Sequence, residues 1–256
     1  MITTPVSDAL PALGVDDNTL SVSEKQHLDE QGFLHLPGLI PPAIIDGMRR
    51  RTSELLAMEG DNACSEFHKE DGADRLANLV DKGDVFRICY THPRVLAAVA
   101  HVLQGDMKLS SLNSRFALPG KGLQALHADW GGAVAPGNYQ VCNSIWLLDD
   151  FTPENGATRF VRASHRLGRT PQQEMADPTA PHPREELILA PAGTVVVFNS
   201  HLWHGGTLNR TDAPRRAVHS YWTRRGQAQQ QNQRKLLRES TIAGLNEAER
   251  ILLDVD

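Results

Sequence analysis

The stretch Leu123-Gln-Ala-Leu-His-Ala-Asp-Trp130 places a histidine and a carboxylate two residues apart. If this segment is an extended strand, His127 and Asp129 project from the same face of it. One imidazole and one carboxylate on one face are two of the three ligands of a two-histidine, one-carboxylate metal site. The third ligand would then be a second histidine that the fold brings in from a distant part of the chain.

Two histidines further along the chain are candidates for that third ligand. The run Gly193-Thr-Val-Val-Val-Phe-Asn-Ser-His-Leu-Trp-His-Gly-Gly206 contains both His201 and His204. Residues three apart in an extended chain face opposite sides, so only one of the two can point toward His127 and Asp129. The pattern leaves open which one does. A ligand set of this kind with open coordination positions suits non-haem Fe(II) oxygenases.

A pair of arginines follows this run at the start of another predicted strand, Pro214-Arg-Arg216. Neighbouring residues of a strand point to opposite faces, so one arginine can enter the interior while the other stays at the surface. A buried guanidinium there would favour a carboxylate that it can bind through two hydrogen bonds.

The composition favours one large domain and argues against several classes of function. The chain has 256 residues, of which 40% are hydrophobic, and a net charge of −5, which does not suit nucleic-acid binding. Its three cysteines, Cys64, Cys89 and Cys142, fit neither a disulfide framework nor a zinc site. Because no signal-peptide pattern or long apolar run is present, we expect a cytoplasmic protein without membrane contact.

The first part of the chain reads as a flexible leader over residues 1–22 and a helical part over residues 23–105. Capping-box spacing at Ser23–Gln26 predicts the start of the first helix, and Pro41-Pro42 predicts the start of the second. Residues 61–84 read as a long acidic loop of the kind that often forms a lid. The expected elements are a helix ending near Gly32, a strand at Phe33–Leu36, a helix ending at Gly60 and a helix at Pro93–Leu103.

From residue 106 to residue 225 the pattern changes to short strands separated by Gly, Pro and Asn, as in an all-β core. We expect about eight strands, which suits a double-stranded β-helix of the jelly-roll, cupin-like type. A C-terminal helical tail over residues 226–256 would complete a single domain running from residue 23, with Asn246 capping its last helix. The expected strands are Met107–Leu118, Leu123–Asp129, Gln140–Leu148, Thr158–Val161, Glu186–Leu189, Thr194–Phe198, Trp203–Leu208 and Arg215–Trp222.

Taken together and in order, these motifs resemble the phytanoyl-CoA dioxygenase family of iron(II)- and 2-oxoglutarate-dependent oxygenases. The resemblance covers roughly residues 24 to 225. Its motifs are Leu28-Asp-Glu-Gln-Gly-Phe-Leu-His-Leu-Pro37, His127-Ala-Asp129, Asp149-Asp-Phe-Thr-Pro-Glu-Asn-Gly-Ala157, Ala163-Ser-His165 and His204-Gly-Gly-Thr-Leu-Asn209 with Arg215.

The resemblance implies a ligand set and a set of cofactors. The metal ligands, and thus the catalytic centre, would be His127, Asp129 and His204, which leaves His201 in a structural role. The cofactors would be Fe(II), 2-oxoglutarate as co-substrate and O2, and Arg215 would bind the distal carboxylate of 2-oxoglutarate. Further contacts to the co-substrate would come from Gln124, Trp146 and Asn113.

The resemblance also implies the reaction. Oxidation of an unactivated C–H bond would be coupled to the conversion of 2-oxoglutarate to succinate and carbon dioxide. Halogenating relatives have a small residue in place of the carboxylate, so Asp129 favours hydroxylation or a related oxidation. The usual Pro-Gly-Ser-His of the family is Arg162-Ala-Ser-His165 here, which we expect to alter only a turn.

Other readings of the same residues stay open at this stage. A zinc hydrolase also uses two histidines and a carboxylate, but it has no need of an inward arginine. In a non-catalytic cupin-like binding protein the metal ligands would be dispensable. Within the family, an acyl-CoA or amino-acid hydroxylase is an alternative to an enzyme of specialised metabolism. We expect a small-molecule substrate and no nucleic-acid partner, and the oligomeric state is left open.

Overall fold

The computed structural model describes residues 6–105 and 107–255. Its α-helices are α1 Val6–Ala12, α2 Val22–Gln31, α3 Pro42–Glu59, α4 Ile88–Thr91, α5 Pro93–Leu103, α6 Pro171–Glu174, α7 Gln233–Leu236, α8 Glu239–Ala243 and α9 Glu247–Leu253. Its strands are β1 Phe33–Leu36, β2 Ala73–Leu76, β3 Met107–Ala117, β4 Val141–Leu147, β5 Thr158–Val161, β6 Glu185–Leu187, β7 Val195–Asn199, β8 His204–Gly206 and β9 Arg215–Arg224. Short 3-10 turns lie at Gly60–Asn62, Leu79–Asp81, Asp84–Phe86 and Ser164–Arg166.

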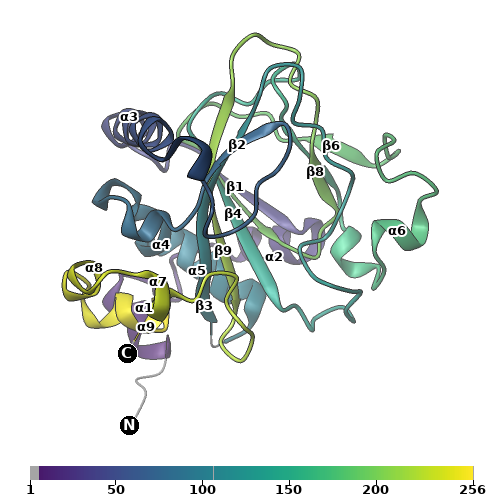
Figure 1. Cartoon of the computed structure of the whole chain (residues 1–256). Helices are drawn as coiled ribbons and strands as arrows, with labels where there is room; N and C mark the ends of the chain where they lie inside the picture. The colour runs from purple at the N-terminus through teal and green to yellow at the C-terminus, as the bar shows by residue number, and fades with distance from the viewer. Residues whose placement is uncertain (1–5, 106, 256) are drawn as a thin grey trace.

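The strands form two antiparallel sheets. The larger sheet has the order β1-β7-β4-β9-β3-β2 and the smaller one the order β6-β5-β8. Helices α3, α4 and α5 and the C-terminal helices lie on one side of the larger sheet, and the smaller sheet lies on the other (Figure 1). This confirms the predicted jelly-roll type of β core with flanking helices, although the described strands do not close into a barrel.

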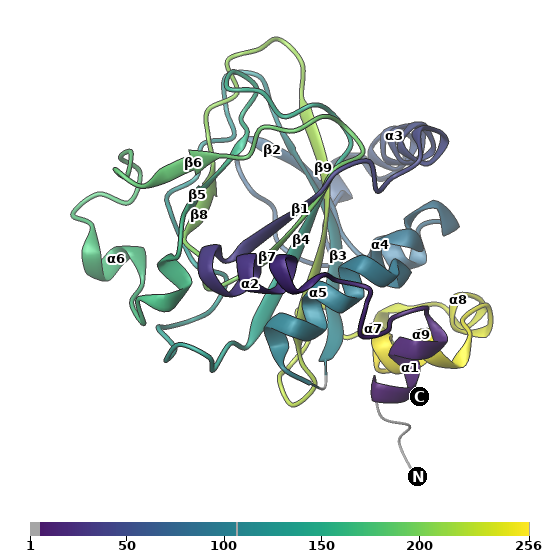
Figure 2. The same ribbon diagram turned by 180° about the vertical axis from the view of Figure 1, so that it is seen from behind.

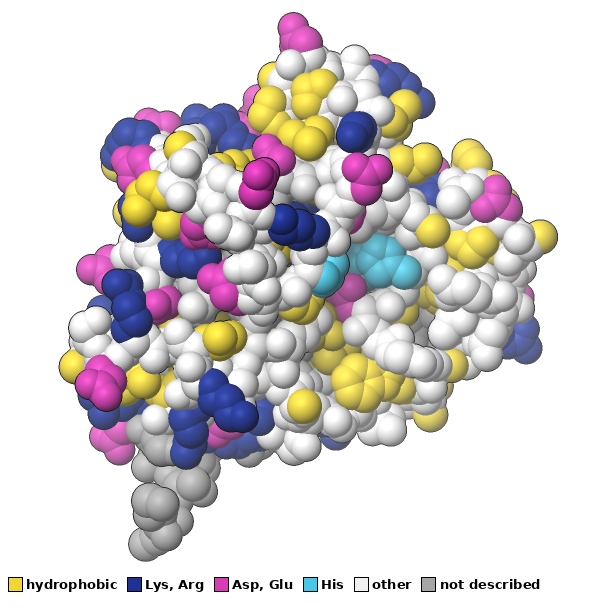
Figure 3. Space-filling model, in the orientation of Figure 1, with side chains coloured by type: hydrophobic (Ala, Val, Ile, Leu, Met, Phe, Trp, Pro, Cys, Tyr) yellow, Lys and Arg dark blue, Asp and Glu magenta, His cyan; other side chains and the backbone are white. Residues whose placement is uncertain are grey.

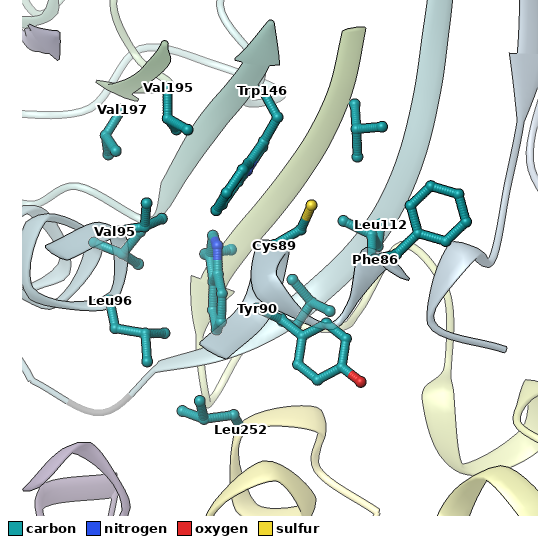
Figure 4. Close-up of a cluster of buried hydrophobic side chains, with 14 of the residues drawn as sticks. Phe86, Cys89, Tyr90, Val95, Leu96, Leu112, Trp146, Val195, Val197 and Leu252 are labelled. Atoms are coloured by element: carbon teal, nitrogen blue, oxygen red, sulfur yellow. The ribbon is translucent and has the colours of Figure 1, made fainter. Parts of the chain in front are cut away.

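Two hydrophobic clusters hold these layers together. One lies between the larger sheet and the helices and contains Trp146, Trp222 and Leu96, each less than 2% exposed (Figure 4). The other lies between the two sheets and contains Phe160 and Phe198. The larger sheet is therefore covered on both faces, which is why β3 and β4 are buried along their whole length.

The start of the chain differs from the sequence prediction in two ways. Helix α2 is capped by Ser21 with Glu24, not by Ser23, so the capping box begins two residues earlier than expected. From Val6 onward the expected flexible leader is instead an ordered segment, and residues 1–5 lie outside the described part. Helix α1 of this segment packs against α9, and Val6 and Ala9 bury their side chains in the core on that side of the protein. Figure 2 shows the two helices far from β5 and β6.

The segment Leu123–Asp129 is extended but is not a strand, which corrects another prediction. Its only ladder contact is an isolated bridge between His127 and His204. Its N–H groups bond to separate segments of the chain, since Leu126 donates to the carbonyl oxygen of Pro178 and Asp129 to that of Ser200. The loop at 61–84 in turn contains an unpredicted strand, β2, which pairs with β3.

The C-terminal tail is helical as expected, and Asn246 caps α9 through a capping box with Glu249. None of the helices that the structure describes is both long enough and apolar enough to cross a membrane.

Candidate active site

His127, Asp129 and His204 converge at one end of the space between the sheets. The nitrogen and oxygen atoms that they offer all lie within 4.8 Å of one another. Asp129 Oδ1 is 3.4 Å from His204 Nε2 and 3.7 Å from His127 Nε2. The two imidazole rings have centroids 4.3 Å apart. The two-histidine, one-carboxylate arrangement expected from the sequence is therefore assembled.

Backbone pairing, not the alternation of a strand, brings the two histidines together. His127 and His204 exchange two N–H to carbonyl hydrogen bonds of 2.9 Å. This close approach depends on the glycines after His204, because a Cβ at Gly206 would lie 2.6 Å from the carbonyl oxygen of Gly122. The sequence His204-Gly-Gly206 thus supplies one candidate ligand, and its glycines leave space for the segment that carries His127 and Asp129.

Both histidines present Nε2 toward the carboxylate. His127 Nδ1 lies 2.9 Å from the carbonyl oxygen of Ala125, and His204 Nδ1 lies 2.8 Å from that of Leu202. A ring nitrogen facing a carbonyl oxygen donates its proton, so Nε2 is left as the free acceptor that a metal ion needs.

The electrostatics of the cluster keep Asp129 ionised. Burial raises the pKa of the carboxyl, but His204 and His127 lower it more, so the net pKa lies below its ordinary value. Burial and the neighbouring His204 lower the pKa of His127, whereas Asp129 outweighs burial at His204 and raises the pKa of that residue. A carboxylate between two imidazoles is a donor set suited to a divalent transition metal.

The cluster faces a cavity of about 580 Å³. Histidine side chains are visible in a hollow on the face seen in Figure 3. The larger sheet forms one wall, where the strand register places Asn113, His219 and Ile145 in one row and Ser111, Tyr221 and Asn143 in the next. Loop 61–84 forms another wall through Phe67, His68 and Glu70.

Two of these wall residues hold Asp129 in place. The hydroxyl of Tyr221 donates a hydrogen bond of 2.7 Å to the backbone carbonyl oxygen of Asp129. The amide of Asn143 donates a longer one, of 3.4 Å, to Asp129 Oδ2. Strands β9 and β4 thereby orient the only carboxylate of the cluster.

Arg215 enters the same cavity from the start of β9 and is 2% exposed. Its Nη2 donates to the carbonyl oxygen of Gly156 and its guanidinium lies over the ring of Phe151, but its buried Nε has no partner. In the described part of the chain it makes no salt bridge, and burial together with Arg115 lowers its pKa to about 9. Its neighbour Arg216 points the other way and pairs with Asp149, as expected from strand alternation.

The three further residues expected around the co-substrate have different outcomes. Asn113 lines the cavity, and its buried Oδ1 has no partner. Gln124 also lines it, although its amide is already bound to Glu70 and to the backbone N–H of Gly206.

Trp146 lies outside the cavity, which corrects that prediction. Because Ile145 faces the cavity, the next residue of β4 faces the opposite side. There the indole of Trp146 packs among the helices and donates to the hydroxyls of Ser144 and Ser220 (Figure 4).

His201 takes the structural role expected for it. Its Nε2 accepts a hydrogen bond from the backbone N–H of Gln140, and its ring does not join the cluster. The loop 61–84, expected as a possible lid, does line the cavity.

Sequence reasoning missed several residues of the site. A period of two would have found Tyr221 from Arg215 on β9, and Arg115 from Asn113 on β3. Asn143 could not have been found in this way, because the expected inward position of Trp146 puts it on the other face of β4. Glu70 had no such signal, because it lies on an irregular loop whose path depends on what it contacts.

Comparisons with known proteins agree with this geometry. A family model described as phytanoyl-CoA dioxygenase matches residues 28–217. The dioxygenase trt7 of Aspergillus terreus is 29% identical over 205 residues, covering 75% of this chain and 70% of that protein.

Solved structures share the fold at lower identity. HygX from Streptomyces hygroscopicus, solved with nickel and 2-oxoglutarate bound, superimposes with a TM-score of 0.68 at 18% identity, covering 82% of this chain and 89% of that one. SnoN, an α-ketoglutarate-dependent epimerase from nogalamycin biosynthesis, gives a TM-score of 0.63 at 19% identity, covering 84% and 83%.

The family match spans most of the chain and includes the His-Asp-His cluster and Arg215. The protein is therefore a member of the phytanoyl-CoA dioxygenase family, an enzyme that uses Fe(II), 2-oxoglutarate and O2 as a dioxygenase.

Proposed function

We propose that His127, Asp129 and His204 hold Fe(II) and that Arg215 binds the distal carboxylate of 2-oxoglutarate. The enzyme then oxidises a C–H bond of a small molecule, with hydroxylation as the outcome, and releases succinate and carbon dioxide. The observation that carries this proposal is Arg215, a buried cation that has no carboxylate partner among residues 6–105 and 107–255 and shares one cavity with the three ligand atoms.

The residues present fit these cofactors. Two Nε2 atoms and one ionised carboxylate offer three ligands from one side, so an iron ion would keep open positions for a 2-oxoacid and dioxygen. When bound together, these cofactors supply the oxidising power for an unactivated C–H bond. Arg215 would fix the orientation of the co-substrate through paired hydrogen bonds, and the unpartnered Asn113 Oδ1 lies in the same cavity.

The size and lining of the cavity support a small-molecule substrate. A volume of about 580 Å³ is in the range of ordinary ligand pockets, and its wall mixes apolar side chains with amides and hydroxyls. SnoN belongs to nogalamycin biosynthesis, which supports a role in specialised metabolism. That neighbour is an epimerase, so an oxidation other than hydroxylation is the alternative outcome, and an acyl-CoA or amino-acid hydroxylase is the alternative substrate class.

Two other classes of function fit the site less well. A zinc hydrolase needs the three ligands and a water molecule but leaves the buried charge of Arg215 without a role. A cupin-like binding protein would not require Asp129 to be held in place by Tyr221 and Asn143. The predicted cytoplasmic location stays a prediction.

The test is an anaerobic titration with Fe(II) and 2-oxoglutarate that follows the visible metal-to-ligand charge-transfer band. We expect the band in wild type and in His201→Ala, where the substituted residue lies outside the cluster. We expect it to be lost in His204→Ala. Arg215→Ala should keep the band but weaken 2-oxoglutarate binding by about a hundredfold, since a charge-assisted pair in a buried site is lost.

Metal-loaded wild type without a band would contradict the oxygenase assignment, and zinc-dependent hydrolysis would then be assayed. A band lost in His201→Ala but kept in His204→Ala would show that the third ligand is misassigned. Succinate release in the presence of candidate substrates follows once the band is established.

A further inference from the structure

Glu70 reaches from the acidic loop 61–84 into the active-site cavity and binds two arginines. Its carboxylate accepts hydrogen bonds from Arg115 Nε at 3.0 and 3.1 Å and from Arg115 Nη2 at 2.6 Å. Arg75 Nη1 lies 3.2 Å from Glu70 Oε2, which also accepts from Arg115 Nε. No other acidic residue of loop 61–84 lines the cavity in the described structure.

The charge of Glu70 matters because three arginines line this cavity. Burial raises the pKa of the Glu70 carboxyl, but the hydrogen bond and charge of Arg115, with Arg75, lower it below its ordinary value, so the group is ionised. Arg75 and Arg115 therefore share one carboxylate, whereas Arg215 makes no salt bridge within the described residues. His219, between them, is neutral, since burial and Arg215 lower its pKa to about 3.

Glu70 and Arg115 also act on Arg215 in opposite directions. Burial lowers the pKa of Arg215 most, Arg115 lowers it further, and Asp149 and Glu70 raise it, so the charges of Arg115 and Glu70 both act on the guanidinium that we assign to the co-substrate. Glu70 further holds Gln124, whose Nε2 donates to Glu70 Oε1 at 3.1 Å while its Oε1 accepts from Gly206 N–H at 3.0 Å. One loop carboxylate thus positions Arg115 and Gln124 and sets the charge around Arg215.

We propose that Glu70 sets the positive charge that the co-substrate meets in this cavity. It neutralises Arg115 and holds it with Gln124 at the cavity wall, so that the distal carboxylate of 2-oxoglutarate pairs with Arg215. The inference rests on the proposed function of Arg215. The inference adds that loop 61–84, through Glu70, helps to determine which ligand charge is favoured next to Arg215.

A double-mutant cycle on 2-oxoglutarate binding tests the proposal, with the charge-transfer band of the Fe(II)-loaded protein as the readout. Arg115→Gln leaves the Glu70 carboxylate to repel the incoming dianion and should raise the dissociation constant about tenfold. Glu70→Gln leaves Arg115 as a second cation beside Arg215, so its dissociation constant should be about threefold below that of wild type. The double variant should return to within about threefold of wild type, because the two lost charges cancel.

A purely structural role for this ion pair predicts the opposite pattern, in which each single variant weakens binding and the double variant is no better than Arg115→Gln. That result would overturn the proposal. The matched control is Asp71→Asn, which removes a charge one residue away. The Asp71 side chain is 99% exposed and pairs only with Lys121, so 2-oxoglutarate binding should not change.

Two further comparisons keep the outcomes distinct. Wild type without a charge-transfer band would mean that the proposed function fails, whereas a band in wild type without rescue in the double variant would contradict only the role of Glu70. If Arg115→Gln does not fold, the question is decided by comparing the 2-oxoglutarate dissociation constants of Glu70→Gln and Asp71→Asn. A dissociation constant for Glu70→Gln at or above that of Asp71→Asn contradicts the proposal.

Discussion

Both candidate histidine ligands make the same local hydrogen bond, from Nδ1 to the carbonyl oxygen two residues earlier. That bond fixes the tautomer and the ring orientation before any ion arrives, so the site is organised by its own backbone. Asp129 lacks such a local partner for its orientation and depends on β9 and β4, through Tyr221 and Asn143.

At this scale we predict that Tyr221→Phe weakens Fe(II) binding by about tenfold while the fold is kept, because outer hydrogen bonds tune metal affinity by such factors. The measurement is an anaerobic Fe(II) titration with circular dichroism as a check of folding. Tyr90→Phe is the control, since Tyr90 lies in the helix-side core (Figure 4). Unchanged Fe(II) affinity in Tyr221→Phe would show that the hydroxyl does not position Asp129.

Between elements, a buried histidine joins the turn Ser164–Arg166 to helix α2. His165 is 2% exposed, and its Nε2 lies 3.1 Å from the backbone oxygen of Asp29. Burial lowers the pKa of His165 to about 4, against an ordinary value of 6.5. The neutral form is therefore favoured in the folded protein.

Stability should accordingly fall as the pH falls. Below about pH 6.5 the unfolded chain takes up a proton at His165 that the folded chain does not accept until about pH 4. The stability that this group contributes is thus fully present above pH 6.5, and between pH 7 and pH 5 about 2 kcal/mol of it is lost. Urea unfolding of wild type and His165→Gln at both pH values measures the effect, and equal losses in the two proteins would contradict it.

At the scale of the whole molecule, α1 near one end of the described chain packs against α9 near the other end (Figures 1 and 2). Both helices contribute side chains to the hydrophobic cluster between the larger sheet and the helices. Val6 is 2% exposed there, whereas Val22 at the start of α2 is 82% exposed. The ordered start of the chain is thus part of the core of the protein.

The matching prediction compares these two valines. Val6→Asp should destabilise the protein by about 3 kcal/mol, because it buries a charge without a partner. Val22→Asp should change the free energy of unfolding by less than about 0.5 kcal/mol, as is usual for surface substitutions. Thermal or urea unfolding of both variants decides the matter, and similar stabilities would show that α1 is not part of the core.

Local sequence patterns determined much of the fold. Short runs of strand-forming residues bounded by Gly, Pro and Asn predicted β3, β4, β5, β7 and β9 to within a few residues, since a strand buried on both faces needs a continuous run of side chains that pack well. Proline and glycine placed the ends of α3, and Asn246 placed the start of α9. The alternation of side chains along a strand explains why Arg215 points into the cavity while Arg216 points to the opposite face and pairs with Asp149.

Tertiary structure alone decided three features of the site. The pairing of Leu123–Asp129 with β8 is made of isolated hydrogen bonds, which leave no periodic trace in a sequence. The inward or outward direction of Trp146 depended on the register of β4 against β9. Glu70 meets Arg115 across 45 residues of chain, and such long-range ion pairs depend on how a loop is folded back, not on its local composition.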